Sequence, residues 1–265
     1  LSVRWRGFGF WHGRSCKMVI PVCRPLLPSA DDLLPYLRRI DRARYYTNHG
    51  QLHEELAQRL ALRFGSDGAG VALASSGTAA LAGAVLGLAG RARAPRPLCI
   101  CPAYSFAATA VAAIICGYEP FFADIDAESW AMTPDDVARL PQLREAGLVI
   151  AVAPYGRAPD VAAWETFSAT SGVPVVIDAA ACFDAPGQGG FGRAQVPVVI
   201  SLHATKTLST AEGGLVLTRD AALLERVRSA LNFGFHDARE SIGPSINGKL
   251  SEYHAAIGLA DLDRW

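Results

Sequence analysis

Apolar and polar positions divide the chain into two kinds of segment that follow one another in turn. Short runs of valine, isoleucine and leucine, bounded by turn residues, predict buried strands. Longer stretches carry apolar residues at helical spacing, as Leu52, Leu56 and Leu60 do in QLHEELAQRLALRFG. The predicted strands are VALAS (71–75), LCIC (98–101), PFFADID (120–126), GLVIAVAPYG (147–156), VPVVIDAA (173–180), VPVVISLH (196–203) and GGLVLT (213–218).

Helices are predicted between these strands and on either side of them. Two lie within residues 30–64, on both sides of YYTNHG (45–50). The others are SSGTAALAGAVLGLAG (75–90), SFAATAVAAIICG (105–117), TPDDVARL (133–140), APDVAAWETFSATSG (158–172), DAALLERVRSAL (220–231) and LSEYHAAIGLADLDRW (250–265). Strands that alternate with helices predict an α/β fold. Its sheet should be mostly parallel, with helices covering both faces.

The composition is that of a folded protein with a sizeable core. Of the 265 residues, 51% are hydrophobic and 19% are charged, while Lys+Arg and Asp+Glu each number 25. A net charge of zero gives no indication of a nucleic-acid or membrane-surface protein. No apolar run is long enough to span a bilayer.

The cysteines indicate a reducing compartment, and we expect a cytoplasmic protein. None of the six forms a C-x-x-C pair, so no zinc or other metal site is predicted. Four lie in or beside apolar runs, where a free thiol behaves as a small hydrophobic residue; they are Cys99, Cys101, Cys116 and Cys182. This pattern favours free thiols over a disulfide framework.

Two residues with chemical function follow predicted strands, at the end where such sheets bind ligands. Asp178 ends the apolar stretch of VPVVIDAA, where a carboxylate is costly unless a cation or a hydrogen bond meets it. Lys206 follows VPVVISLH, and a lysine amine can form a Schiff base with an aldehyde cofactor. The simpler alternatives are a salt bridge or N-cap for Asp178 and an ordinary surface position for Lys206.

Three further features lie at strand ends. SSGT (75–78) places small residues and a hydroxyl at a helix N-terminus, which suits a phosphate but is also the pattern of a plain N-cap. Ser201 is a second candidate phosphate ligand, and it shares a predicted strand face with His203, for which a satisfied core position is the simpler role. Phe106 offers a surface for a planar ring, or is a core aromatic.

Together these features match the needs of pyridoxal phosphate. This cofactor takes a lysine for its aldehyde and a carboxylate for its pyridinium nitrogen. It also needs a phosphate cup and a surface against its ring. The motif G-x-G-x-x-G of dinucleotide-binding folds and the P-loop motif G-x-x-x-x-G-K-[ST] are both absent from the candidate turns.

The chain resembles the DegT/DnrJ/EryC1/StrS family of nucleotide-sugar aminotransferases, which have the type I fold of pyridoxal phosphate enzymes. The resemblance runs from about Met18 to Trp265. It rests on an ordered set of motifs: YYTNHG (45–50), SSGTAAL (75–81), PAYSFAATA (102–110), FFADID (121–126), VAPYGRAPD (152–160), VVIDAAACF (175–183), SLHATKTLSTAEGG (201–214), NFGF (232–235) and INGKLSEYHAAIGLA (246–260).

The resemblance implies a role for each matching position. Lys206 would carry the cofactor as a Schiff base and move a proton between the two reacting carbons, and Asp178 would pair with the pyridinium nitrogen. The remaining roles are phosphate binding by Gly77, Thr78 and Ser201, ring stacking by Phe106, and contact of Asn232 with a phosphate in the partner subunit. The family implies a homodimer that takes an amino group from glutamate and passes it to a keto group on a nucleotide-linked sugar.

Two departures from the family pattern stand out. Ala181 replaces the glutamine that usually contacts the ring oxygen of the cofactor, and Phe183 replaces the usual histidine. The family also carries a C-terminal small domain beyond the point that corresponds to Trp265. We therefore expect residues 18–265 to form the cofactor-binding large domain without that small domain. Residues 1–17 are expected to be an extension outside the fold.

Two alternatives to an aminotransferase stay open at this point. One is a family member that catalyses another sugar reaction such as dehydration, although the known dehydratases have a histidine in place of the lysine. The other is a truncated, inactive or partner-dependent subunit that only associates with a second chain. Cofactor binding and product analysis discriminate between these alternatives.

Overall fold

The centre of the molecule is a seven-stranded, mostly parallel sheet. The computed structural model describes residues 23–64, 70–184, 191–236 and 238–265, so the predicted extension 1–17 lies outside the described residues. The strand order is β1-β7-β6-β5-β4-β2-β3. The strands are β1 (Gly70–Ala74), β2 (Leu98–Pro102), β3 (Glu119–Ala123), β4 (Ala146–Val152), β5 (Val175–Asp178), β6 (Val198–Ser201) and β7 (Gly214–Thr218). Each predicted strand is present, which confirms the predicted α/β fold.

One strand of the sheet runs against the others. β7 pairs antiparallel with both β1 and β6, whereas the remaining pairs are parallel. Ser201 at the end of β6 lies opposite Gly214 at the start of β7, so residues 202–213 form a hairpin connection between neighbouring strands. This connection contains Lys206. Hydrophobicity alone could not reveal the reversal, because a buried strand is equally apolar in either direction.

Helices lie between the strands as the sequence predicts. They are α1 (Ala30–Ala43), α2 (Gln51–Arg63), α3 (Gly77–Leu88), α4 (Ala107–Ile115), α5 (Pro134–Ala138), α6 (Val161–Ser171), α7 (Ala221–Leu231) and α8 (Glu252–Leu262). Thr133 caps α5 by accepting a hydrogen bond from the Asp136 amide, as the sequence predicts. Gly172 ends α6 with a φ of 69°, a left-handed conformation that glycine adopts without strain.

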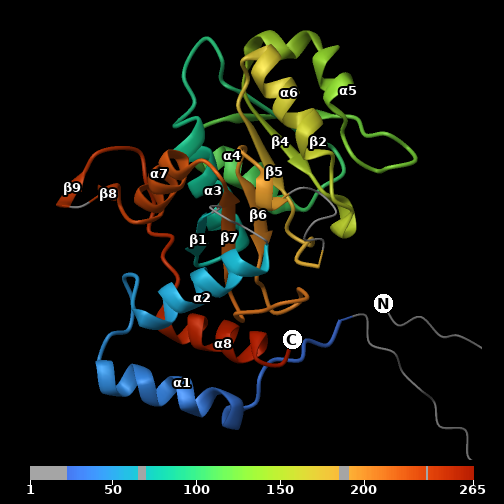
Figure 1. Cartoon of the computed structure of the whole chain (residues 1–265). Helices are drawn as coiled ribbons and strands as arrows, with labels where there is room; N and C mark the ends of the chain where they lie inside the picture. Colours follow the sequence, from blue (N-terminus) through green and yellow to red (C-terminus); the bar gives the residue numbers. More distant parts are fainter. Residues whose placement is uncertain (1–22, 65–69, 185–190, 237) are drawn as a thin grey trace, which may run out of the picture.

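The two faces of the sheet are covered by different helices. Val71 and Leu73 of β1 pack into one buried cluster, while Ala72 and Ala74 pack into the other. This alternation is the two-residue period of a strand that is buried on both sides. The cluster on one face includes residues of α3, α4 and α7, and the cluster on the other includes residues of α1, α2, α5, α6 and α8. Figure 1 shows α1 and α2 beside the C-terminal helix α8, although they are distant in sequence.

Several local features differ from the sequence prediction. β6 ends at Ser201, so His203 lies in the connection and not on the strand face of Ser201. Its side chain is 43% exposed and lies 3.6 Å from Glu212, so His203 is not the satisfied core histidine considered above. A small hairpin of β8 (Phe235–His236) and β9 (Ala238–Ser241) and three short 3₁₀ turns, η1 (Pro141–Glu145), η2 (Pro154–Gly156) and η3 (Phe191–Arg193), were not predicted. Such short, partly polar segments carry no clear periodicity.

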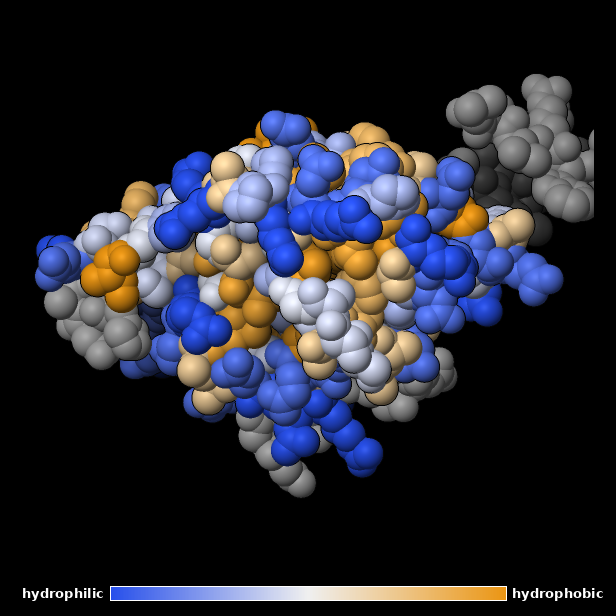
Figure 2. Space-filling view, turned by 90° about the horizontal axis from the view of Figure 1, so that it is seen from above, coloured by the Kyte–Doolittle hydropathy of each residue, from blue (hydrophilic) through white to orange (hydrophobic). Residues whose placement is uncertain are grey.

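Figure 2 shows apolar residues reaching the surface between hydrophilic ones on the face seen from above. Across the described ranges, no helix combines the length and the hydropathy that a membrane crossing needs. The cysteines in the described part of the chain are free; Cys23 is exposed, and Cys99, Cys101, Cys116 and Cys182 are buried, as predicted for small hydrophobic residues.

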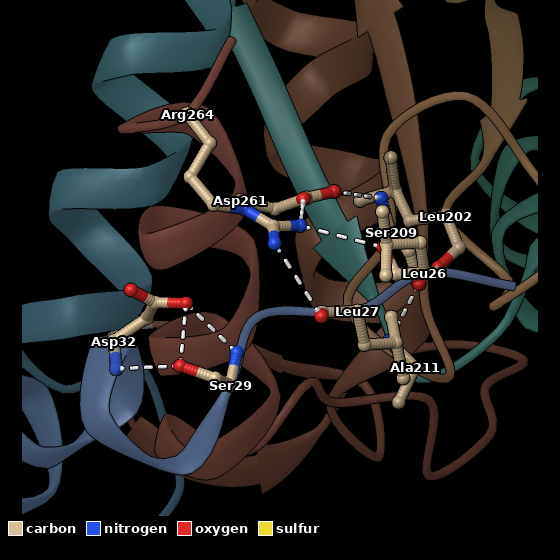
Figure 3. A network of polar contacts seen from close by, with 9 residues as sticks. All are labelled: Leu26, Leu27, Ser29, Asp32, Leu202, Ser209, Ala211, Asp261 and Arg264. Carbon is tan, nitrogen blue, oxygen red and sulfur yellow. Dashed lines mark hydrogen bonds and ion pairs between the residues drawn. The ribbon is translucent and has the colours of Figure 1, made fainter.

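A polar network ties the last helix to the connection that contains Lys206. The Asp261 carboxylate, 9% exposed, accepts a hydrogen bond from the Ser209 amide at 2.9 Å and pairs with Arg264 at 2.7 Å. Arg264 in turn donates to the carbonyls of Leu26 and Leu27 (Figure 3). The strand connection is therefore held from outside the sheet by α8.

Replacing Asp261 by alanine should destabilise the fold. The Ser209 amide belongs to a residue that is 3% exposed, and it would lose its acceptor. An unsatisfied buried donor costs about 1–3 kcal/mol. We expect the free energy of unfolding in urea to fall by that amount in Asp261→Ala, whereas the exposed Asp135→Ala changes it by less than about 0.5 kcal/mol. Equal stability of the two variants would contradict this role of Asp261.

Candidate active site

A cavity of about 330 Å³ opens at the carboxyl ends of β4 and β5. Asp178 is the last residue of β5, and Lys206 enters from the connection between β6 and β7. Phe106, the residue immediately before α4, lines the cavity from a third element. Tyr104, Ser105, Phe106, Val152, Ala153, Pro154, Tyr155, Asp178, Ala180, Ala181 and Lys206 line this cavity. Three of the predicted site residues thus share one cavity.

Asp178 is a buried carboxylate with few polar partners. It is 5% exposed, and Thr109 Oγ1 donates to its Oδ2 at 2.7 Å. The Ala180 amide donates to Oδ1 at 3.2 Å. Burial raises the pKa of Asp178, while the hydrogen bonds from Thr109 and Ala180 and the nearby charge of Lys206 oppose this rise. The carboxylate therefore lies where a further cation would be strongly favoured.

Thr109 is a site residue that the sequence did not reveal. It lies inside α4 and is 1% exposed. Ser105 Oγ is 2.6 Å from Thr109 Oγ1, so a chain of hydroxyls leads from the lining of the cavity to the Asp178 carboxylate. In an almost wholly apolar helix a single threonine looks like a core residue, and its partner is 69 positions away in sequence. Only the tertiary structure connects the two.

Replacing Thr109 by valine tests whether this hydrogen bond positions Asp178. Valine has a similar shape but cannot donate, so the buried carboxylate loses a charge-assisted hydrogen bond of about 1.5–3 kcal/mol. We expect the rate of the amino transfer that the family resemblance implies to fall about tenfold or more, and the pH profile of that rate to shift. Thr109→Ser, which keeps the donor, should restore both. A valine variant with wild-type rate and pH profile would exclude the positioning role.

Two of the phosphate candidates, Gly77 and Ser201, lie close together, and the Ser201 amide donates to the carbonyl of Ala180, which lines the cavity. Ser76 caps α3 by accepting a hydrogen bond from the Ala79 amide, and Gly77 and Thr78 begin the helix. A Cβ atom built on Gly77 would lie 3.1 Å from Ser201 Cβ and Oγ, so the helix start and Ser201 are in close contact. Ser201 is 7% exposed at the end of β6. A helix N-terminus beside a hydroxyl suits an anion.

The two positions that depart from the family pattern behave differently. Ala181 lines the cavity. Phe183 is 1% exposed and packs edge to face on Phe64 at 5.8 Å and on Trp265 at 5.2 Å between ring centroids. Phe183 is therefore a core residue and does not line the cavity.

Phe106 and Asn232 complete the set of predicted residues. Phe106 is 83% exposed, which is unusual for a large apolar side chain unless something covers it. Asn232 lies elsewhere, beside a smaller cavity of about 220 Å³ that His49, Glu54 and Arg228 also line. The structure does not bring Asn232 to the cavity of Asp178 and Lys206 in the same chain.

An aromatic group at the cavity was not singled out in the sequence. The hydroxyls of Tyr104 and Tyr155 are 2.7 Å apart, and both residues line the cavity. The Trp130 ring lies 6.0 Å from each of them. Trp130 and Tyr155 have φ values of 59° and 49°, a left-handed conformation that is rare for bulky residues. In the sequence, the turn APYG predicted only the end of a strand at this position.

Comparison with known proteins extends over nearly the whole chain. The model of the DegT/DnrJ/EryC1/StrS aminotransferase family matches residues 29–265. Protein Rv3402c of Mycobacterium tuberculosis is 36% identical over 258 residues, which are 94% of this chain and 61% of that protein. The dTDP-4-amino-4,6-dideoxy-D-glucose transaminase of Shigella dysenteriae is 32% identical over 254 residues, which are 91% of this chain and 64% of that enzyme.

A solved structure agrees with these sequence matches. DesI, crystallised with its TDP-sugar product, is 31% identical and superposes with a TM-score of 0.77, covering 91% of this chain and 59% of DesI. The chain spans 61% to 64% of the length of the two curated relatives. The residues that match the family model include all strands of the central sheet and both Asp178 and Lys206. The chain therefore belongs to the DegT/DnrJ/EryC1/StrS aminotransferase family.

Proposed function

We propose that this chain is the cofactor-binding part of a pyridoxal phosphate-dependent aminotransferase. Its reaction would take an amino group from glutamate and pass it to a keto group on a nucleotide-linked sugar. The observation that carries the proposal is the meeting of Asp178 and Lys206 in one cavity of a chain of this family. A buried carboxylate and a lysine that arrive from separate strand ends are hard to explain as a surface ion pair.

The residues around the cavity fit the cofactor. Asp178 is buried and its pKa is raised, because its hydrogen bonds do not fully offset the cost of burying its charge. A protonated ring nitrogen would stabilise this carboxylate. The contact between Gly77 and Ser201 leaves a hydroxyl beside the N-terminus of α3, which suits the phosphate. The exposed ring of Phe106 lines the same cavity and suits a stacked planar ring.

Each residue has a defined task in this mechanism. When bound, pyridoxal phosphate supplies an electron sink that stabilises negative charge on the carbon next to the transferred nitrogen. The amine of Lys206 would bind the aldehyde and then act as general base and acid at the reacting carbons. Asp178 would hold the proton on the ring nitrogen. Gly77, Thr78 and Ser201 would orient the group through its phosphate, and Phe106 would keep water from one ring face.

The substrate class rests on the relatives. The Shigella dysenteriae relative is a transaminase of a dTDP-linked dideoxy sugar, and DesI was crystallised with a TDP-sugar product. A nucleotide-linked keto-sugar is therefore the acceptor that we propose here. The exposed aromatic side chains of Tyr104 and Tyr155 at the same cavity are suited to contact a sugar ring.

A second copy of the chain is part of the proposal. Asn232 lies away from the cavity of its own chain, as a residue that serves a partner subunit would. α4 and the edge strand β3 carry exposed apolar side chains that an interface would cover, namely Val111, Ile114, Ile115 and Phe122. We propose a homodimer, and a cytoplasmic location in keeping with the free, buried thiols.

The test supplies both halves of the reaction separately. The protein is mixed with pyridoxal phosphate and glutamate, and 2-oxoglutarate is measured; the 4-keto-6-deoxy sugar linked to dTDP is then added, and the products are identified by mass spectrometry. We expect 2-oxoglutarate first and the amino sugar second. A deoxygenated sugar would favour dehydration. Failure to bind the cofactor, together with a stable complex with a longer relative, would favour the partner-dependent subunit.

A further inference from the structure

The start of α2 carries two histidines and a glutamate whose donor atoms converge. His49 precedes the helix by two residues, His53 lies in its first turn, and Glu54 follows. The two imidazole centroids are 4.6 Å apart, edge to face. One donor atom from each of the three side chains lies within 4.8 Å of the other two. We propose that these residues bind one transition-metal ion of the zinc type.

The donor set matches the chemistry of such an ion. Two imidazoles and a carboxylate are the three protein ligands of many zinc sites that keep a fourth position for water. Metal–ligand distances of about 2.0–2.2 Å put the donors of a tetrahedral ion about 3.4 Å apart. His53 Nδ1 and Glu54 Oε1 are 3.2 Å apart and already have this spacing. His49 can complete the set by a small movement of its ring.

The His53 ring has a polar atom that the protein leaves unused. His53 is 5% exposed, and within the described ranges its Nε2 has no hydrogen-bond partner. The Glu54 carboxylate contacts one ring nitrogen, while the other is buried without a partner, a condition that is rare in native structures. Turning the ring by 180° exchanges the two nitrogens. In either orientation one ring nitrogen lies beside the Glu54 carboxylate, where it is placed to share an ion with Glu54 and His49.

A buried carboxylate, that of Glu252, lies next to the cluster. Glu252 is 2% exposed, and its carboxylate accepts hydrogen bonds from the Leu52 amide at 2.8 Å and the His53 amide at 2.9 Å. His49, Glu54 and Glu252 also line a cavity of about 540 Å³, which leaves room for water as a further ligand. The two carboxylates favour a cation in this place.

Positive side chains also face the cluster from other elements. Arg39 of α1 lines the larger cavity, where it pairs with Glu55, and the charge of Lys249 acts on His49. Arg228 of α7 shares a smaller cavity with His49 and Glu54. Its guanidinium is paired with Glu225 one helical turn earlier, which offsets its charge. The ion would join the turn before α2 to the first turn of that helix, beside Asn232 and away from Lys206 of the same chain.

The experiment measures zinc binding to the whole chain without pyridoxal phosphate. Equilibrium dialysis should give one zinc ion per wild-type chain, and cobalt in its place should give the visible absorption of a four-coordinate site. We expect His49→Ala and Glu54→Gln each to weaken binding at least about tenfold, as loss of a ligand or of its support does. His254→Ala removes a histidine that pairs with Ser251 instead, and it should bind zinc like the wild type.

The design separates loss of binding from loss of folding. The Glu54 side chain is 52% exposed, so Glu54→Gln leaves the core untouched and its fold can be checked by circular dichroism. Zinc should raise the thermal midpoint of the wild type and of His254→Ala but not that of Glu54→Gln, since only a ligand that binds the folded chain stabilises it. Absence of stoichiometric zinc in the wild type, or equal affinity in all four proteins, would overturn the proposal.

Discussion

Lys206→Ala is expected to abolish amino transfer, by at least about 10⁴-fold, because it removes both the nucleophile and the proton carrier. After incubation with pyridoxal phosphate and reduction with borohydride, the wild type should carry the cofactor covalently on the peptide that contains Lys206. The alanine variant should carry none. Absorbance before reduction and peptide mass mapping afterwards measure the two results.

The sequence makes this experiment unusually clean. The chain contains three lysines, Lys17, Lys206 and Lys249, so few amines compete for the label. Lys249 is the matched control because desolvation lowers its pKa, which makes its amine a better nucleophile than an ordinary surface lysine. It lies over the Phe233 ring and does not line the cavity of Asp178. Lys249→Ala should leave the label on Lys206. A label found on Lys249 in the wild type, and lost in Lys249→Ala, would refute the assignment.

The prediction of the sheet succeeded where its signals were local. Each run of valine, isoleucine and leucine became a strand, and residues such as Val198, Val199 and Ile200 divide between the two core clusters as a doubly covered sheet requires. Because parallel strands end at one edge of the sheet, the sequence predicts that Asp178 and Lys206 lie at the same edge. The hydrophobic pattern does not show in which direction a strand runs, so only the structure reveals that β7 is antiparallel.

The contacts of the site depend on tertiary distances that the sequence does not show. Thr109 reaches Asp178 across 69 positions, and its helix gives no sign of a polar task. Phe183 stands where the family usually has a histidine, and it packs against Phe64 in the core. Motif matching could assign a role to each position, but only packing decides which side chain reaches the cavity. The roles themselves stay predictions for the variants to test.

Asp178→Asn is expected to separate stability from activity. Burial raises the pKa of Asp178 in the folded chain above its ordinary value. Between the unfolded and folded pKa values the unfolded carboxyl loses its proton first, so the ionised group opposes folding increasingly as the pH rises and fully above the folded pKa. Asparagine removes this cost. We therefore expect the cofactor-free variant to be at least as stable as the wild type at pH 7, with the difference vanishing below the unfolded pKa.

The same substitution should slow amino transfer by about 10²–10³-fold, since a neutral amide no longer holds a proton on the ring nitrogen. The Thr109 hydroxyl can still hydrogen bond to the amide, so the cavity should keep its shape. Denaturation in urea at several pH values and the rate of 2-oxoglutarate formation give the two readouts. A variant that is both less stable and equally active would mean that Asp178 is a structural carboxylate. If Asp178 is a buried charge that serves catalysis, the variant should be more stable but slow. Such a group opposes folding and is useful only when a cation lies beside it.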